Sequence, residues 1–189
     1  DDNPDAPWQS GVDYTEYRYS VDGGETWTEW TEASSFSFPE DSNHLLQYRC
    51  FDNVGKVDSE EKEFVVDSQA PEITKTVGEP KISCNPENED CYNQEEQLCD
   101  YWITQDTEIC LSATDPQPHP SGDVQIRCMA TVWETLQSDP FNVEIELDEN
   151  GCFTYDEDSY HELYCTATDA LGNTAELYEA DIVDTEAPE

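Results

Sequence analysis

The sequence predicts an all-β protein built from β-sandwiches. Short segments of alternating apolar and polar residues recur along the chain, separated by Gly, Asp, Asn and Pro. No stretch of useful length has the period of an amphipathic helix. A repeat adds to this: residues 44–72 align without a gap with residues 161–189, with nine identities in 29 positions. Short strands in this repeated arrangement predict two tandem copies of one sandwich module.

In the first copy the alternation begins with a strand at Val12–Val21, which carries aromatic residues on one face. The segment Asp22–Gly24 follows as a tight turn, because its glycines accept positive φ. Thr26–Thr31 is expected to return as the paired strand and carries two tryptophans. The remaining strands of this copy are expected at Ser34–Phe38, Leu45–Phe51 and Glu60–Val66.

The second copy repeats the plan and adds a strand and a cysteine-rich insertion in front. Its strands are expected at Glu72–Val77, Glu108–Thr114, Val124–Val132, Phe141–Leu147, Tyr160–Thr168 and Ala175–Val183. The predicted boundaries are a first module at residues 1–68, a linker at 69–72, and a second module at 73–189 with an insertion at 83–100. A proline stiffens the joint between the modules.

The two copies differ at their fronts. Ser10-Gly11 aligns with Ser121-Gly122, yet about 50 residues of the second module precede this pair and only nine residues precede it in the first. The first module is therefore expected to lack its first two strands, which exposes a sheet edge and part of its core. Either an upstream segment holds the missing strands, which is the simpler explanation, or another chain supplies them by strand addition.

The overall charge excludes several classes of partner. The formal net charge is −39, from 46 acidic and seven basic residues, so the surface repels nucleic acids and anionic membranes and attracts cations. Only 35% of residues are hydrophobic, but 11% are aromatic, which favours folded domains with small cores over a disordered acidic chain. No apolar run has the length of a membrane span.

Several motifs together resemble the Ig-like repeats of large archaeal cell-surface and extracellular filament proteins. The motifs are Asp22–Gly24, Asp52–Gly55, Thr74–Lys81, Trp102–Thr104, Ala113–Pro120, Ala167–Asn173 and Val183–Pro188. The resemblance covers nearly the whole chain. It implies two Ig-like (fibronectin III-like) sandwiches in an extracellular array, such as an S-layer-associated protein, an adhesin or a filament. It carries over no catalytic residue.

The three histidines do not indicate catalysis. His44 and His161 occupy the same position of the repeat, which favours a structural role, and His119 lies between two prolines. No nucleophile elbow, phosphate-binding loop or pair of metal-binding histidines is present in the sequence. The sequence therefore predicts that the protein is not an enzyme.

Acidic loops raise the question of calcium. Asp52 and Asp169 precede turn glycines and are expected to accept hydrogen bonds from their own turns. Calcium needs about six to eight oxygen ligands, which loop carboxylates near the joint can provide. The candidate calcium ligands are Asp1, Asp2, Asp5, Asp67, Glu72, Asp115 and Asp184.

Tryptophans of the first module offer a second kind of site. Trp8, Trp27 and Trp30 can stack on a sugar ring. In small sandwiches such residues more often pack in the core or pair across strands. Their exposure decides between carbohydrate binding and packing.

Eight cysteines in an acidic, strand-rich chain indicate disulfides and an extracellular or cell-surface location. The candidates are Cys50, Cys84, Cys91, Cys99, Cys110, Cys128, Cys152 and Cys165. Cys50 is alone in the first module, and any two of the three insertion cysteines can close that loop. Alternation directs Ile109 and Leu111 inward and Cys110 outward, which argues against a bridge from Cys110 across the sandwich. Spacing does not reveal the pairing.

These observations predict a non-enzymatic structural module of a repetitive surface protein or filament. Its partners would be neighbouring modules or identical subunits, joined by strand complementation in the second case. The alternative is an adhesin that binds carbohydrate or protein and depends on calcium.

Overall fold

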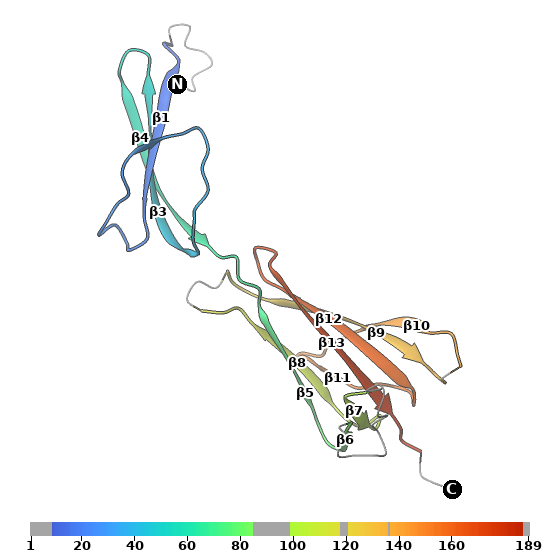
Figure 1. The fold of residues 1–189 in the computed structure, drawn as a ribbon. Helices are drawn as coiled ribbons and strands as arrows, with labels where there is room; N and C mark the ends of the chain where they lie inside the picture. Colours follow the sequence, from blue (N-terminus) through green and yellow to red (C-terminus); the bar gives the residue numbers. More distant parts are fainter. Residues whose placement is uncertain (1–8, 85–98, 118–120, 136, 187–189) are drawn as a thin grey trace. The chain divides into compact units, whose positions relative to one another are not determined.

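The structure is a computed structural model that describes residues 9–84, 99–117, 121–135 and 137–186. The described residues form strands and turns and no helix, which confirms the predicted all-β class (Figure 1). Their contacts divide the chain into two compact units: unit 1 is residues 1–68 with 117–121, and unit 2 is residues 69–116 with 122–189. No apolar helix of membrane-spanning length is present in the described part of the chain.

The described residues of unit 1 form one antiparallel sheet of four strands in the order β2-β1-β3-β4. Its strands are β1 (Val12–Ser20), β2 (Thr31–Glu32), β3 (Ser42–Asp52) and β4 (Val57–Val66). The turn after β1 forms as predicted, with φ of 72° and 93° at Gly23 and Gly24. Asp22 closes this turn by accepting hydrogen bonds from the side chain and backbone of Thr26, which lower the pKa of Asp22 to about 2.

Two strand predictions for unit 1 are wrong. Thr26–Thr31 does return beside β1 and hydrogen-bonds it at Thr28, but only its last residue belongs to a strand, the two-residue β2. Ser34–Phe38 is also irregular. Residues 152–153, which lie 117 positions after 35–36, form strand β11 (Cys152–Phe153) by pairing with β8 (Ile109–Thr114). The described part of unit 1 has no counterpart of β8, so Ser34–Phe38 has no neighbouring strand to pair with.

In the part of unit 2 that the structure describes, the strands form two sheets, one of six strands (β10-β9-β12-β13-β7-β6) and one of three (β11-β8-β5). The strands not yet given are β5 (Glu72–Val77), β6 (Lys81–Ser83), β7 (Tyr101–Ile103), β9 (Gln125–Trp133), β10 (Phe141–Ile145), β12 (Tyr160–Thr168) and β13 (Thr174–Val183). All six strands predicted for this part of the chain are present, with ends shifted by two residues at most. The short strands β6, β7 and β11 were not predicted, because two or three residues show no alternation.

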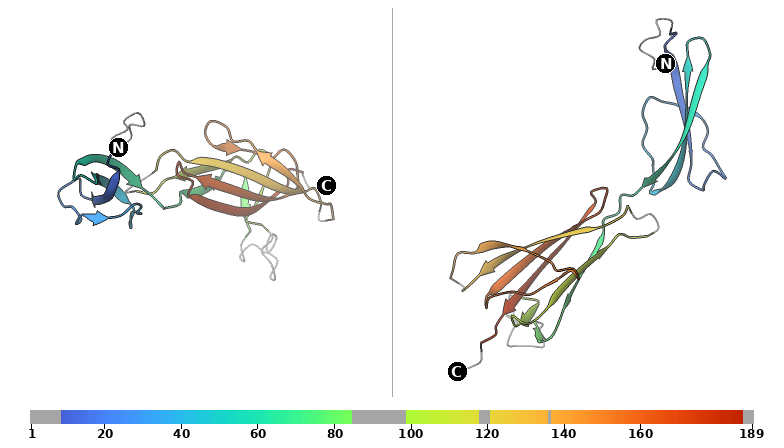
Figure 2. Two further views of the ribbon diagram at one scale, coloured as in Figure 1. Left: turned by 90° about the horizontal axis from the view of Figure 1, so that it is seen from above. Right: turned by 180° about the vertical axis from the view of Figure 1, so that it is seen from behind.

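The core of unit 2 lies between its two sheets. Ile109, Leu111 and Phe153 point inward from the three-stranded sheet. They meet residues of the larger sheet such as Leu163 and Ala130, both fully buried. In Figures 1 and 2, β5 and β8 of the smaller sheet are green to yellow-green, and β9, β10, β12 and β13 of the larger sheet are yellow to red. Two sheets around one core are consistent with the predicted β-sandwich.

The 117-residue repeat is visible as matching contacts in the two units. Asp52 accepts hydrogen bonds from the backbone of Val54 and Lys56, and Asp169 accepts the same pair from Leu171 and Asn173. Both turn predictions are confirmed. The sequence identities also continue upstream of the aligned segment, at residues 36, 40, 41 and 42.

Candidate functional sites

One face of the unit 1 sheet corresponds to the core face of unit 2. We call it the inner face. It consists of alternate residues of β1, β3 and β4, namely Thr15, Tyr17, Tyr19, His44, Leu46, Tyr48, Cys50, Asp58, Glu60, Lys62 and Phe64. Each β3 or β4 residue in this set lies 117 positions before an inward-pointing residue of β12 or β13.

The inner face is only partly covered. Phe36 stacks on Tyr17 with ring centroids 4.0 Å apart, and Phe38 lies against His44, also at 4.0 Å. No described strand of unit 1 lies over this face, since all its strands belong to one sheet. Phe64 is consequently 40% exposed, whereas Asp181, its counterpart in unit 2, is fully buried.

Each unit has a buried histidine that packs against an aromatic ring. His44 donates from Nδ1 to the Ser42 carbonyl oxygen at 3.1 Å. In unit 2, His161 stacks on Tyr155 with centroids 3.7 Å apart, and burial lowers the pKa of His161 to about 4. The imidazole of His161 is therefore neutral at physiological pH and fills space between the sheets, in keeping with the structural role expected from the repeat. His119 lies outside the described residues.

The opposite, outer face of unit 1 carries a ladder of aromatic and cationic side chains. The Arg18 guanidinium lies 4.8 Å from the ring centroids of both Trp27 and Trp30. The Arg49 guanidinium lies 3.9 Å from Trp30 and forms an ion pair with Glu16 at 2.6 Å. Both tryptophans are half-buried, and their rings form cation–π contacts with arginines of the sheet.

A hollow of about 420 Å³ lies beside this ladder. It is lined by Trp30, Gln47, Arg49, Val57, Ser59, Glu60 and Glu61. The Trp30 side chain therefore forms one wall of this open, polar hollow. The Trp27 ring instead lies against the Arg18 guanidinium, and its Nε1 donates a hydrogen bond to the Gly24 carbonyl oxygen. Of the three tryptophans proposed for sugar stacking, Trp30 is thus the best placed, and Trp8 lies outside the described residues.

The carboxylates proposed as calcium ligands lie in different surroundings. Asp115 and Asp169 of unit 2 place carboxylate oxygens within 4.8 Å of each other. Glu72 is exposed at the start of β5, and Asp184 is exposed after β13. In the described part of unit 2, neither of these two belongs to a group of three potential metal ligands. Asp67 is buried, and Asp1, Asp2 and Asp5 lie outside the described residues.

Among the described residues, three disulfides join six of the eight cysteines. Cys84 pairs with Cys99, Cys110 with Cys152, and Cys128 with Cys165. The first closes the insertion, and the other two link directly opposite residues of neighbouring strands, β8 with β11 and β9 with β12. Cys50 is a free, half-buried thiol on the inner face of unit 1, and Cys91 lies outside the described residues.

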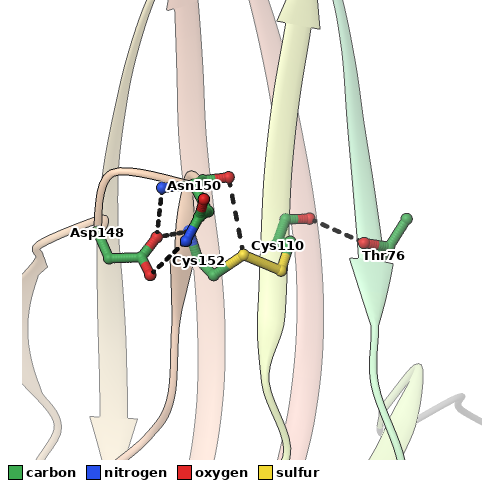
Figure 3. Close-up of a disulfide and its surroundings, with 5 residues drawn as sticks. All are labelled: Thr76, Cys110, Asp148, Asn150 and Cys152. Atoms are coloured by element: carbon green, nitrogen blue, oxygen red, sulfur yellow. Dashed lines mark hydrogen bonds between the residues drawn. A yellow bond between two sulfur atoms is a disulfide. The ribbon is translucent and has the colours of Figure 1, made fainter.

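The Cys110–Cys152 bridge lies on the side of its sheet that faces away from the core, so the outward direction predicted for Cys110 is confirmed (Figure 3). The turn before it is held by Asp148, whose Oδ1 accepts hydrogen bonds from the backbone of Asn150 and Cys152, both at 2.8 Å (Figure 3). The Thr76 hydroxyl donates a hydrogen bond to the Cys110 carbonyl oxygen and so links β5 to β8 beside the disulfide. This bridge therefore fastens the outer surface of the smaller sheet.

Comparison with known protein families finds no family model that matches the chain, and comparison with curated proteins finds no match either. The case for a function therefore rests on the geometry of the two units. The three disulfides are compatible with an extracellular protein.

Proposed function

We propose that this chain is a non-enzymatic structural part of a repetitive extracellular protein, made of two tandem Ig-like sandwich units. In this proposal, β-strands from outside the described residues complete the first unit. The inner face of unit 1, which is only partly covered, is the observation that carries the proposal.

The comparison with unit 2 supports this view. There, β5, β8 and β11 cover the equivalent face, and Cys165 and Ala167 are fully buried. In unit 1 the equivalent residues Tyr48 and Cys50 are half-buried and Phe64 is exposed. A second layer of strands would remove these side chains from water, at about 25 cal/mol per Å² of apolar surface.

The charge pattern specifies the missing strands further. In unit 2, Lys75 of β5 meets Glu179 of β13. The position equivalent to Glu179 in unit 1 is Lys62. A covering strand in unit 1 would therefore carry a carboxylate where β5 carries a lysine.

The setting is extracellular and the partners are neighbouring modules or identical subunits of an array. Three disulfides require an oxidising compartment. The charge of −39 keeps the surface hydrated and repels nucleic acids and anionic membranes. The resemblance to Ig-like repeats of archaeal cell-surface and filament proteins points to the same class.

A designed hairpin tests the proposal. It joins copies of Glu72–Val77 and Ile109–Thr114 by a short turn, with glutamate in place of Lys75, and is added to the full chain. Hydrogen exchange at β3 and β4 should slow, because the hairpin covers the inner face. The hairpin that keeps lysine is the matched control and should bind more weakly, since it faces Lys62.

Unchanged exchange with both hairpins at saturating concentration would argue against an acceptor face. A Phe64→Glu variant adds an independent check, because a charge on the inner face should abolish binding. The control variant Tyr178→Glu, at a residue of unit 2 that is 63% exposed, should leave binding intact.

A second candidate function is carbohydrate binding at the hollow beside Trp30, and the open position of that ring favours it. Titration with oligosaccharides should then change tryptophan fluorescence in the wild type and not in Trp30→Ala. Calcium dependence of either function is tested by thermal unfolding with and without a chelator, where equal melting temperatures would exclude a stabilising calcium ion.

A further inference from the structure

A lysine is buried between two carboxylates in the core of unit 2. Lys75 lies on β5, in the three-stranded sheet, and its side chain is 2% exposed. Its Nζ lies 2.7 Å from Oδ2 of Asp181 and 2.7 Å from Oε2 of Glu179, both on β13 of the facing sheet. The Asp181 side chain is fully buried. Lys75 and Asp181 therefore meet across the sandwich away from water, whereas the Glu179 side chain is 27% exposed.

Such a cluster is costly to keep ionised. Removing ammonium and carboxylate groups from water costs several kcal/mol for each ion, and their attraction repays this only when every polar atom is satisfied. Here Oδ1 of Asp181 and the nearby Tyr155 hydroxyl have no hydrogen-bond partner among the described residues. The pair lacks the full set of hydrogen bonds that would stabilise it as ions.

The directions of the pKa shifts agree with this environment. Burial raises the pKa of Asp181, and the charge of Lys75 offsets only part of that rise, so the carboxyl group is shifted toward its neutral acid form. Burial alone would lower the pKa of Lys75, but the charge of Asp181 and the hydrogen bonds with both carboxylates raise it. A second carboxylate on the lysine, that of Glu179, provides a place for the ammonium proton.

We propose that Lys75 and Asp181 condense into an intramolecular amide cross-link, with Glu179 as the proton-transfer group. Glu179 takes a proton from the ammonium, and the freed Nζ attacks Cγ of the protonated Asp181. A C–N bond forms and a C–O bond breaks. The departing hydroxyl receives a proton from Glu179 and leaves as water, and Glu179 then takes the second proton that the nitrogen loses as the amide forms. Glu179 ends as a neutral acid, so atoms and charges balance and no oxidant is needed.

Position and packing favour the reaction over hydrolysis. The sandwich holds the amine against the carboxyl group across 106 residues of sequence, which replaces a bimolecular encounter by a fixed contact. Condensation also converts a buried ion pair into a neutral amide, which lowers the cost of burial. The site is thus a self-modification site, and its substrates are two side chains of the same unit.

The cross-link joins the first and the last strand of unit 2. If the chain carries load in an array, as proposed above, tension entering at β5 would pass through this bond into β13 without unfolding the strands between them. This consequence rests on the proposed function, whereas the bond itself does not. The test below reads the bond alone, so failure of the array proposal would leave its result unaffected.

Intact mass spectrometry of the full chain, fully reduced and alkylated so that disulfides do not contribute, is the test. The wild type should weigh one water less than its sequence. After denaturation, trypsin should fail to cleave at Lys75, and a branched peptide containing Lys75 and Asp181 should be found. Lys62, which forms an exposed ion pair with Glu60 at 3.3 Å, is the internal control and should be cleaved.

Variants separate condensation from simple contact. Lys75→Arg keeps the positive charge but not the amine and should have its full sequence mass. Glu179→Gln keeps shape but cannot accept the proton, so the uncondensed mass should accumulate. A wild-type chain with its full sequence mass, cleaved after Lys75, would overturn the proposal, and so would a water deficit that persists in Lys75→Arg.

Discussion

The Cys128–Cys165 disulfide should provide a large part of the stability of unit 2. It links directly opposite residues of β9 and β12 in the middle of the larger sheet, and both sulfurs are buried. The bridge closes a segment of 37 residues. The loop-closure relation for the unfolded chain gives about 4 kcal/mol for a loop of this length. Cys110–Cys152 remains closed in the variant and shortens the effective loop only slightly, so the figure changes little.

The perturbation is the double substitution Cys128→Ala with Cys165→Ala, which opens the loop and leaves the site apolar. Hydrogen exchange followed by mass spectrometry on peptides from β9 and β12 reads the stability of unit 2 without a contribution from unit 1. A loss of about 3 to 4 kcal/mol raises the exchange rates of the most protected amides by roughly 100- to 1,000-fold. Cys50→Ala removes a cysteine that closes no disulfide in the described structure and should leave these rates unchanged.

An increase of less than about tenfold in the double variant would refute the reasoning, because the entropic contribution would then be below about 1.4 kcal/mol. That outcome would mean that the unfolded chain is already confined by residual structure or by its remaining bridges.

Three further substitutions test particular contacts. Leu163→Ala opens a cavity at a fully buried position and should lower the unfolding free energy by about 3 kcal/mol, measured by urea denaturation; a loss near zero would contradict a packed core. Gly151→Ala should cost at least about 2 kcal/mol, since φ is +79° and the new Cβ would lie 2.5 Å from the Leu111 carbonyl oxygen. His161→Phe keeps a ring against Tyr155 but cannot titrate. Because the pKa of His161 is about 4 in the fold and 6.5 in the reference state, the wild type should lose up to about 3 kcal/mol relative to this variant as pH falls from 7 to 4. Parallel pH dependence of the two proteins would show that His161 is not a neutral buried group.

Predictions that depended on neighbouring residues were the most accurate. The turns at Asp52 and Asp169 form as expected, because a carboxylate two and four residues before the amides it binds is a local pattern. The inward direction of Ile109 and Leu111 followed from the alternation of side chains along a strand. Ser34–Phe38 failed although its sequence suits a strand, because a strand also needs a partner.

The candidate sites were harder to predict, since each combines residues that are distant in the chain. No spacing rule pairs Cys110 with Cys152 or Cys128 with Cys165. Trp27 and Trp30 stand out in the sequence as candidates for sugar stacking, but the arginines whose guanidinium groups lie against their rings come from other strands. Lys75 was not recognised as a site residue, because in sequence it is one polar residue of an alternating strand.

The sequence by itself determined the all-β class, the positions of most strands, the turns and the repeat of 117 residues. These follow from side-chain periodicity and local backbone preferences, which are written in adjacent residues. The tertiary structure alone decided which cysteines pair, that β5, β8 and β11 cover one unit while the matching face of the other stays partly open, and that Lys75 meets Asp181. These facts depend on how strands far apart in sequence pack and pair, and packing between sheets has no signature in the spacing of residues along the chain.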